Sequence, residues 1–456
     1  MDIHQTSPAS GASSGQSGIA HAPVAPTHRS GANTTPRAEE PSFAALENLY
    51  RSVRGQTQVL CEPLETDDYM LQSMPEASPA KWHLAHTTWF FETFVLADYA
   101  RHYRPFDPRF SFLFNSYYEA VGERWPRPQR GLLSRPTVGE VFRYRAHIDE
   151  AVYELMAYPM DPEAANRILL GLHHEQQHQE LLVTDLKHAW SSNPIHPVYR
   201  PYKPDDGARA LARWIGFGGG LVSIGHDGSA FAFDNEGPRH REFVDACEIA
   251  SRLVTNAEYQ EFIEDRGYER PELWLSDGWA TLRAGRWDAP LYWQREEACS
   301  RWLNVTMAGL REVAPDEPVC HVSFFEADAY ARWAGARLPT EAQWETAADA
   351  AITGNFLEGG RFHPAATIAA DDRGPLHQVN GDVWQWTASP YVGYPGYNPP
   401  AGALGEYNGK FMCNQFVLRG ASCVTPRSHA RRTYRNFFPP EARWQFSGIR
   451  LARDCA

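Results

Sequence analysis

The fold of the first half is decided by a stretch that combines helical spacing with three histidines, Gly171-Leu172-His173-His174-Glu175-Gln176-Gln177-His178-Gln179-Glu180-Leu181-Leu182. It lies within residues 162–190, where apolar residues recur at three- and four-residue spacing and predict a helix. On that helix His174 and His178 lie four residues apart on one face, with Cβ atoms about 5–6 Å from each other. Both imidazoles could therefore reach one metal ion.

Further helices are expected around this segment, at residues 78–100 and 137–158 and from Phe43 onward. Four long helices joined by loops predict an antiparallel bundle, which can build a metal site from side chains on facing helices. The segment Trp82-His83-Leu84-Ala85-His86 supplies the third candidate ligand, His86. The histidines crowd this half, which favours a metal over satisfied histidines on a polar helix face.

The character of the chain changes after residues 202–206. Gly, Pro, Trp and Asn become frequent and apolar runs become short. Residues 218–225 look like a strand between turns, and helices are expected only near residues 256–266, 324–334 and 340–351. The sequence therefore predicts a multidomain α and α+β protein. Its parts are a disordered tail (1–42), rich in Ser, Gly, Ala and Pro, a helical bundle (43–205) and an α+β domain (206–456).

Composition excludes several classes of partner. The chain has 456 residues, 43 Lys and Arg against 56 Asp and Glu, and a net charge of −13, so nucleic acid and anionic membranes are not expected partners. Seven scattered cysteines indicate reduced thiols rather than a disulfide framework. There is no apolar run long enough to span a bilayer and no secretory signal. A cytoplasmic protein that acts on small molecules is expected.

The spacing of His174-Glu175-Gln176-Gln177-His178 also fits the zinc-protease pattern HExxH, in which the Glu is the general base. The match is weakly specific when it stands alone, and nothing downstream forms a clear third ligand in that style. A protease is therefore a minor alternative.

Two sets of motifs carry a family resemblance. The Trp82–His86 segment together with His174-x3-His178-x-Glu180 resembles the DinB-type helical domain of the EgtB/OvoA sulfoxide synthases. The second half is similar to the formylglycine-generating-enzyme, or sulfatase-modifying-factor, domain, a variant of the C-type lectin fold. The matching stretches are Leu338-Pro339-Thr340-Glu341-Ala342-Gln343-Trp344-Glu345, Gly381-Asp382-Val383-Trp384-Gln385-Trp386-Thr387, Leu418-Arg419-Gly420-Ala421-Ser422-Cys423 and Ser447-Gly448-Ile449-Arg450-Leu451-Ala452-Arg453. The resemblance covers about residues 43–455.

These enzymes use non-haem iron(II) and oxygen to join sulfur to the imidazole of histidine or hercynine. The resemblance implies Fe(2+) as cofactor and His86, His174 and His178 as its ligands. Three imidazoles leave more positive charge on iron than the common set of two histidines and one carboxylate. Glu180, about 200° around the helix from His178, is interpreted as a supporting residue.

The resemblance also implies a tyrosine hydroxyl near the iron as proton donor or redox partner. Tyr117 and Tyr118 resemble that position in the subgroup that takes free cysteine. Tyr394 and Tyr397, in a Gly/Pro-rich loop, are the reserve candidates.

Substrate-binding residues are expected in two segments and on the metal-binding helix. Arg124, Arg127 and Arg130 lie in a proline-stiffened loop that suits bidentate capture of a carboxylate, and the sequence does not choose among them. Asn436 is expected to bind the hercynine carboxylate, and the paired aromatic residues Phe437 and Phe438 its trimethylammonium group. Gln177, beside a ligand, could also reach the site.

The expected reaction joins cysteine to C2 of hercynine, giving hercynylcysteine sulfoxide for ergothioneine biosynthesis. A selenoneine synthase of the SenA type, with a selenosugar donor and the same scaffold, is the close alternative. An ovothiol-type reaction at C5 of histidine ranks third, because no fused methyltransferase domain follows within the 456 residues. A lectin-like binding module without catalysis is the alternative of another class.

Overall fold

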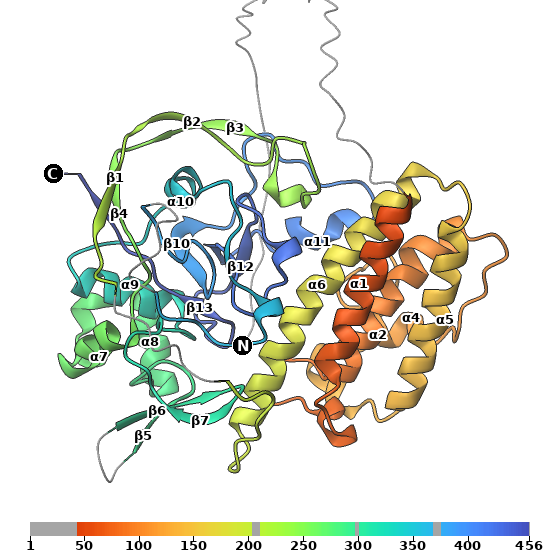
Figure 1. Ribbon diagram of the computed structural model, residues 1–456, viewed down its shortest axis with the longest axis horizontal. Helices are drawn as coiled ribbons and strands as arrows, with labels where there is room; N and C mark the ends of the chain where they lie inside the picture. The colour runs from red at the N-terminus through yellow and green to blue at the C-terminus, as the bar shows by residue number, and fades with distance from the viewer. Residues whose placement is uncertain (1–42, 203–209, 297–300, 368–374, 456) are drawn as a thin grey trace, which may run out of the picture. The chain divides into compact units, whose positions relative to one another are not determined.

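The first half is helical, as the sequence predicted. The computed structural model describes residues 43–202, 210–296, 301–367 and 375–455, so the tail predicted at 1–42 lies outside the described residues. The helices are α1 Phe43–Cys61, α2 Ala80–Phe91, α3 Ala97–Tyr99, α4 Phe110–Phe114, α5 Val138–Met156 and α6 Pro162–Ser191. The four long helices α1, α2, α5 and α6 form the expected bundle (Figure 1).

Local sequence sets where these helices begin. Thr137 caps α5 in a reciprocal pair with Glu140, and Asp161 caps α6 just before Pro162. Helix α2 is not an amphipathic surface helix, because all twelve of its residues are buried among α4, α5 and α6. It continues through one π-helical turn, Glu92–Leu96, into α3. Among the described helices, none is both long and apolar enough to cross a membrane.

The second half is built from short strands, as expected for a lectin-like domain. They are β1 Trp214–Phe217, β2 Gly220–Ile224, β3 His240–Val244, β4 Cys247–Ala250, β5 Trp293–Glu296, β6 Arg301–Thr306, β7 Gly309–Glu312, β8 Gly354–Asn355, β9 Asn380–Gly381, β10 Trp384–Pro390, β11 Phe416–Arg419, β12 Asn436–Phe438, β13 Ser447–Gly448 and β14 Ala452–Asp454. The sheets have the strand orders β12-β11-β10-β13, β1-β4-β14, β5-β6-β7, β2-β3 and β8-β9. The α+β class is confirmed.

Helices in this half partly depart from the predicted set. They are α7 Asn256–Glu264, α8 Ser276–Gly285, α9 Phe324–Trp333, α10 Glu341–Ala347 and α11 Glu406–Gly409. Sequence reasoning missed α8, whose two glycines weaken its helical pattern, and extended α10 four residues too far. Because α8 packs its Gly278 against Phe325, in the first turn of α9, tertiary contact stabilises this helix rather than propensity.

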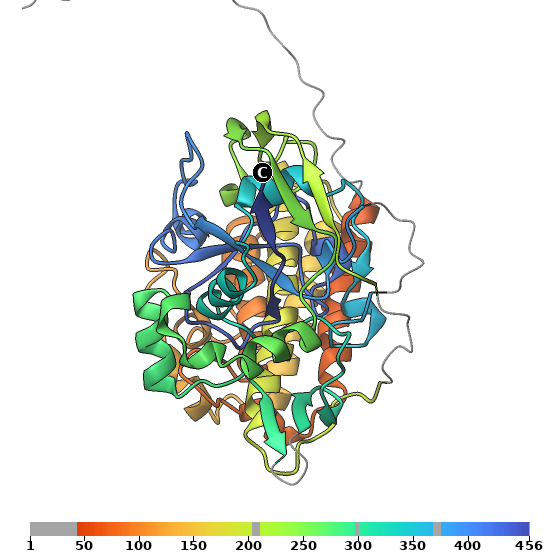
Figure 2. The ribbon, with the colours of Figure 1, turned by 90° about the vertical axis from the view of Figure 1, so that its left-hand side faces the viewer.

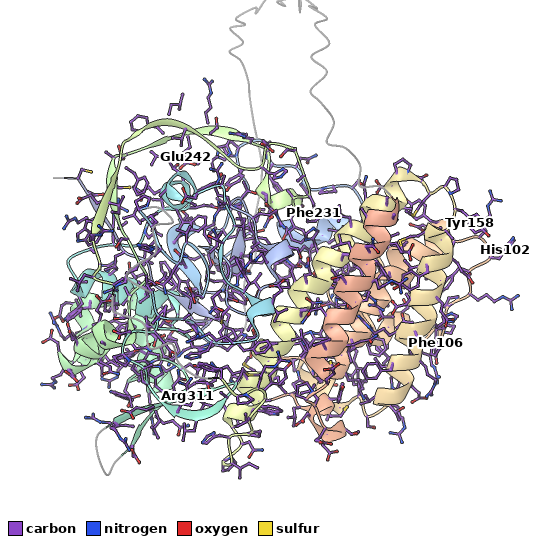
Figure 3. The ribbon with its side chains drawn as sticks, viewed as in Figure 1. His102, Phe106, Tyr158, Phe231, Glu242 and Arg311 are labelled. Carbon is purple, nitrogen blue, oxygen red and sulfur yellow. The ribbon has the colours of Figure 1, made fainter. Side chains whose placement is uncertain are left out.

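The two halves meet along α6, within the single compact unit formed by residues Glu40–Ala456. Viewed from the sheet-rich side, the bundle lies behind the strands (Figure 2). Phe231 points toward α6 (Figure 3), where its ring stacks on His173 with centroids 3.8 Å apart. Glu180 is partly buried in this boundary and accepts hydrogen bonds from Trp384 Nε1 at 2.7 Å and Thr425 Oγ1 at 2.6 Å. Helix α6, which carries the candidate ligands His174 and His178, is therefore also the helix that joins the halves.

Candidate metal centre and substrate pocket

The fold brings together the three histidines proposed as ligands. His86 comes from α2, and His174 and His178 come from successive turns of α6. One ring nitrogen of each lies within 4.8 Å of the other two. Among the described residues this is the one cluster of three or more such side chains with metal-binding spacing.

The hydrogen bonding of these imidazoles fits a metal. His86 Nδ1 donates to the Phe114 carbonyl oxygen at 2.6 Å, which leaves the buried Nε2 of His86 without a partner. Both ring nitrogens of His174 are buried and have no partner either. Buried polar atoms without partners are rare and need an explanation, and a bound cation would provide one here.

Electrostatics point the same way. Burial lowers the pKa of His174 to about 3, and it holds the pKa values of His86 and His178 well below the usual range. All three rings are therefore neutral near pH 7, the form in which imidazole donates a lone pair to a metal.

Glu175, the acid of the HExxH pattern, points away from the three histidines. Its carboxylate accepts hydrogen bonds from Arg145 Nη2 at 2.5 Å, Arg54 Nη1 at 2.8 Å and Thr57 Oγ1 at 2.6 Å. Burial by itself would raise its pKa, but the two arginines lower it to about 2. A carboxylate held this firmly inside the bundle cannot serve as a general base, so the protease alternative does not fit.

This ion-pair cluster should control stability instead. Replacing Glu175 by glutamine in the metal-free protein leaves the buried Arg145 without a counter-charge and Arg54 with Asp149 as its only one. Breaking a buried pair in this way typically costs about 3–5 kcal/mol. Urea unfolding should measure that loss in free energy. Glu47→Gln, at the exposed pair with Arg51, is the matched control and should stay within about 1 kcal/mol of wild type. A loss in Glu175→Gln no larger than the control's would contradict the assignment.

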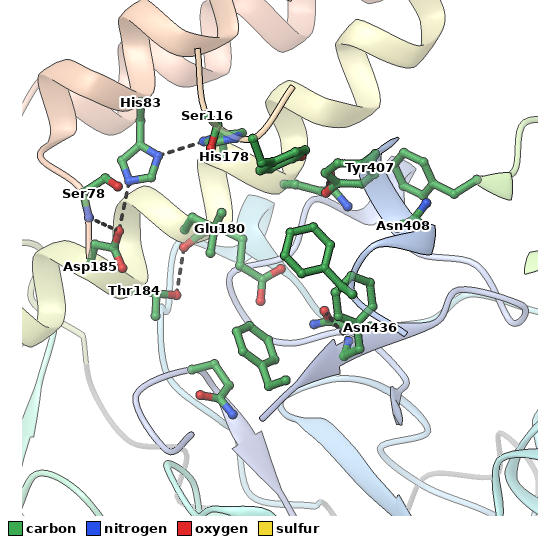
Figure 4. Close-up of a pocket in the computed structure, with 18 of the residues that line it drawn as sticks. Ser78, His83, Ser116, His178, Glu180, Thr184, Asp185, Tyr407, Asn408 and Asn436 are labelled. Carbon is green, nitrogen blue, oxygen red and sulfur yellow. Dashed lines mark hydrogen bonds and ion pairs between the residues drawn. The ribbon is translucent and has the colours of Figure 1, made fainter. Parts of the chain in front are cut away.

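Beside the histidines lies a cavity of about 220 Å³ between the two halves. Figure 4 shows His178 at its edge, with Asn436 and Tyr407 reaching in from the second half. Of the nine proposed catalytic and substrate-binding residues, seven line it, namely Tyr117, Arg127, Arg130, Gln177, Asn436, Phe437 and Phe438. The other two, Tyr118 and Arg124, do not. Tyr118 packs on Trp89 and Phe94 behind the cavity, and Arg124 pairs with Glu119 at the surface.

Tyrosines from both halves meet at the end of this cavity that lies near the three histidines. The Tyr117 ring lies 5.5 Å from the Tyr407 ring in α11. The Tyr407 ring is in turn 6.2 Å from the His174 ring. Burial raises the pKa of Tyr117 well above its ordinary value, so its phenol keeps its proton.

The reserve tyrosines lie elsewhere. Tyr394 donates to Glu341 Oε1 at 3.0 Å, and Tyr397 donates to Asp234 Oδ2 at 2.9 Å. Neither lines the cavity. Sequence reasoning missed Tyr407, which lies in a short helix without any recognisable motif.

Gln177 is held between two tyrosines of the second half. Its Oε1 accepts a hydrogen bond from Tyr407 at 2.5 Å, and its Nε2 donates to Tyr434 Oη at 2.7 Å. These contacts fix the orientation of the Gln177 amide at the cavity wall, near the site where the sequence predicted this residue.

Known proteins are similar in sequence to this chain across both halves. The sulfatase-modifying factor enzyme 1-like domain matches residues 204–374 and 358–455, together more than half of the chain. The hercynine oxygenase of Mycolicibacterium thermoresistibile is 32% identical over 411 residues, which cover 83% of this chain and 88% of that protein. The hercynine oxygenase of Mycolicibacterium smegmatis is 31% identical over 420 residues, 86% of this chain and 95% of that protein. The chain belongs to the hercynine oxygenase family.

Membership in the hercynine oxygenase family favours an enzyme over a binding module without catalysis. A more distant similarity links the chain to the formylglycine-generating enzyme of Bos taurus, at 26% identity over 277 residues, 52% of this chain and 73% of that protein. Gln385, which stands where the sulfatase-modifying pattern has Glu, is fully buried and accepts from Trp344 Nε1 and Arg450 Nε. These contacts hold Gln385 in the interior of the second half.

In this member of the hercynine oxygenase family, the three candidate arginines have different surroundings. Arg124 and Arg127 are exposed, and Arg127 donates to the Glu76 carbonyl oxygen. Arg130 is only 3% exposed and lies over the Trp82 ring at 3.3 Å. It donates to Ser78 Oγ at 2.8 Å and Ser116 Oγ at 3.1 Å, while its Nε has no partner and no carboxylate of the described residues pairs with it. Arg130 is thus a buried cation at the cavity wall with no described carboxylate within ion-pair distance.

Proposed function

We propose that this protein is an iron(II)- and O2-dependent enzyme that joins the sulfur of cysteine to C2 of hercynine. The product would be hercynylcysteine sulfoxide, an intermediate of ergothioneine biosynthesis. The observation that carries the proposal is the neutral His86–His174–His178 cluster beside a cavity lined by both halves of the chain. The names of the relatives, hercynine oxygenases, support the substrate.

The proposed reaction balances without a further cofactor. The C2–H bond of hercynine and the S–H bond of cysteine are broken and a C–S bond is formed. One oxygen atom of O2 goes to the sulfoxide, and the other leaves as water with the two hydrogens. A ferrous ion held by His86, His174 and His178 would supply oxygen activation and bind the thiolate, since three ligands leave positions open.

The protein side chains would bind and orient the substrates. Phe437 and Phe438, on β12, present aromatic rings to the cavity, which suits a trimethylammonium group. Asn436 and Gln177 offer amides for the hercynine carboxylate. We propose accordingly that the bundle (43–205) and the lectin-like domain (206–456) form one active site, in a cytoplasmic setting that keeps thiols reduced.

We further propose that Arg130 binds the carboxylate of the donor. A buried guanidinium with hydroxyl partners alone is poorly compensated, and an incoming carboxylate would supply both charge and bidentate acceptors. Burial, with the positive charge of Arg127, lowers the pKa of Arg130 well below its ordinary value, and Asp185 offsets this only in part. This cation favours an amino-acid donor over an uncharged selenosugar.

Arg130→Met should therefore raise the KM for cysteine by about 10- to 100-fold, the value of a lost charged hydrogen bond of roughly 1.5–3 kcal/mol. The KM for hercynine should change little. Steady-state kinetics with each substrate varied in turn would measure both values. Arg124→Met serves as control and should leave both constants near wild type, because that side chain pairs with Glu119 at the surface. Equal effects of the two substitutions would argue against the assignment.

The proposed function is tested by loading the metal-free protein with Fe(II) anaerobically and then admitting O2. Oxygen uptake should require hercynine and a donor together, and mass spectrometry should find the C–S product with cysteine. Turnover with a selenosugar and none with cysteine would identify the donor as a selenosugar instead of cysteine. Absence of any coupled product with either donor would reject the proposal.

A further inference from the structure

His178 differs from the other two histidines in what holds its second nitrogen. His178 Nδ1 lies 2.8 Å from the Nδ1 of another imidazole, His83. His83 Nε2 lies 3.1 Å from Asp185 Oδ2, which also accepts a hydrogen bond from the Ser78 backbone N–H at 2.7 Å. Figure 4 shows this chain of contacts at one end of the cavity. Asp185 and His83 are both buried.

The contacts allow one neutral arrangement of the protons. The Asp185 carboxylate can only accept, so His83 carries its hydrogen on Nε2 and leaves a lone pair on Nδ1. His178 must then donate from Nδ1, and its lone pair is on Nε2. His86 reaches the same state by a different route, because its Nδ1 donates to the Phe114 carbonyl oxygen. Two of the three imidazoles are thus fixed with Nε2 available.

Helix geometry explains why these groups meet. His83 precedes His86 by three residues on α2, so both lie on one face of that helix. Asp185 follows His178 by seven residues, or about two turns of α6, and shares its face. The loop that enters α2 adds Ser78, which anchors the carboxylate. These contacts therefore connect α2 to α6 directly beside the three clustered histidines.

We propose that Asp185 and His83 are positioning residues that fix the Nδ1–H tautomer of His178 and thereby set the metal affinity of the site. The inference rests on the proposed function only in taking His178 as a ligand. Groups that orient a ligating histidine through its second nitrogen typically contribute about 10- to 100-fold in metal affinity. The sequence alone assigns no role to His83 beyond its proximity to His86.

The test measures Fe(II) and Co(II) dissociation constants of the whole chain anaerobically, by competition with a chelator, together with the Co(II) absorption spectrum. His83→Phe keeps a ring but has no nitrogen, and it should weaken binding about 10- to 100-fold and change the spectrum. His83→Asn places an amide oxygen near the position of Nδ1 and should recover most of that affinity. Asp185→Leu removes the carboxylate that accepts from His83 Nε2 and leaves both histidines in place, so it should also weaken metal binding.

A matched control lies on the same helix. His188 bonds to Ser73 Oγ at 2.6 Å, away from the cluster, so His188→Phe should bind both metals as wild type does. Wild-type affinity in His83→Phe and Asp185→Leu, with affinity lost in His178→Ala, would overturn the positioning role alone. Wild-type affinity in all three would overturn the ligand assignment as well. Should His83→Phe fail to fold, weak binding in Asp185→Leu supports the proposal and wild-type binding there refutes it.

Discussion

His174→Ala is expected to abolish stoichiometric iron binding and to lower turnover by on the order of 1000-fold or more, because it removes a ligand rather than a residue that orients one. The fold should survive. His174 makes no hydrogen bond in the described structure, so its loss leaves no donor or acceptor unpaired. Metal analysis after anaerobic reconstitution, with a thermal melt of the metal-free protein, would measure both effects.

His147→Ala provides the control for this substitution. His147 lies on α5, where its ring packs on Tyr103 and Phe106. These ring contacts do not involve the three clustered histidines. It should keep wild-type iron content and turnover. Iron retained at one equivalent in His174→Ala would remove that residue from the ligand set, and the same comparison applies to His86 and His178.

Tyr117→Phe is expected to change the product more than the rate of oxygen uptake. Reduction of O2 to the oxidation state of water consumes protons, and a positioned general acid typically contributes about 10²–10⁴-fold. Without the Tyr117 phenol, C–S bond formation should fall by that order while oxygen uptake continues. The bound cysteine would then take up both oxygen atoms and appear as cysteine sulfinate, so the ratio of sulfinate to sulfoxide is the measurement.

Tyr118→Phe is the natural comparison, because the structure separates two residues that sequence reasoning could not. Tyr117 lines the cavity, whereas Tyr118 is 2% exposed and packs on Trp89. The shift toward sulfinate should therefore be much smaller in Tyr118→Phe. A wild-type product ratio in both variants would move the proton donor to Tyr407, whose ring lies 5.5 Å from that of Tyr117. If the natural donor is a selenosugar, the product ratio must be measured with the selenosugar as substrate.

The sequence predicted features that depend on local spacing. Helical periodicity located the four bundle helices, and the four-residue interval placed His174 and His178 on one face. His86 came from the family resemblance, and the packing of α2 against α6 brings it to them. Short strands and turns predicted the α+β half, although the glycine-containing α8 was missed.

Features that depend on tertiary partners could not be read from spacing. The three arginines look equivalent in the sequence, and burial against Trp82 is what distinguishes Arg130. Glu175 fits a catalytic pattern until Arg54 and Arg145, distant in the chain, pair with it. Tyr407 approaches Gln177 from 230 residues away. Each role is decided by which side chains the fold brings into contact.

Deuterium at C2 of hercynine reports directly on whether the proposed bond forms at that carbon. Hercynine deuterated at C2 is incubated with the Fe(II)-loaded protein, O2 and cysteine, and the product is analysed by mass spectrometry. We expect a hercynine–cysteine sulfoxide that has lost the deuterium. A coupled product that keeps the C2 deuterium, or unreacted hercynine with both cysteine and a selenosugar, would contradict it.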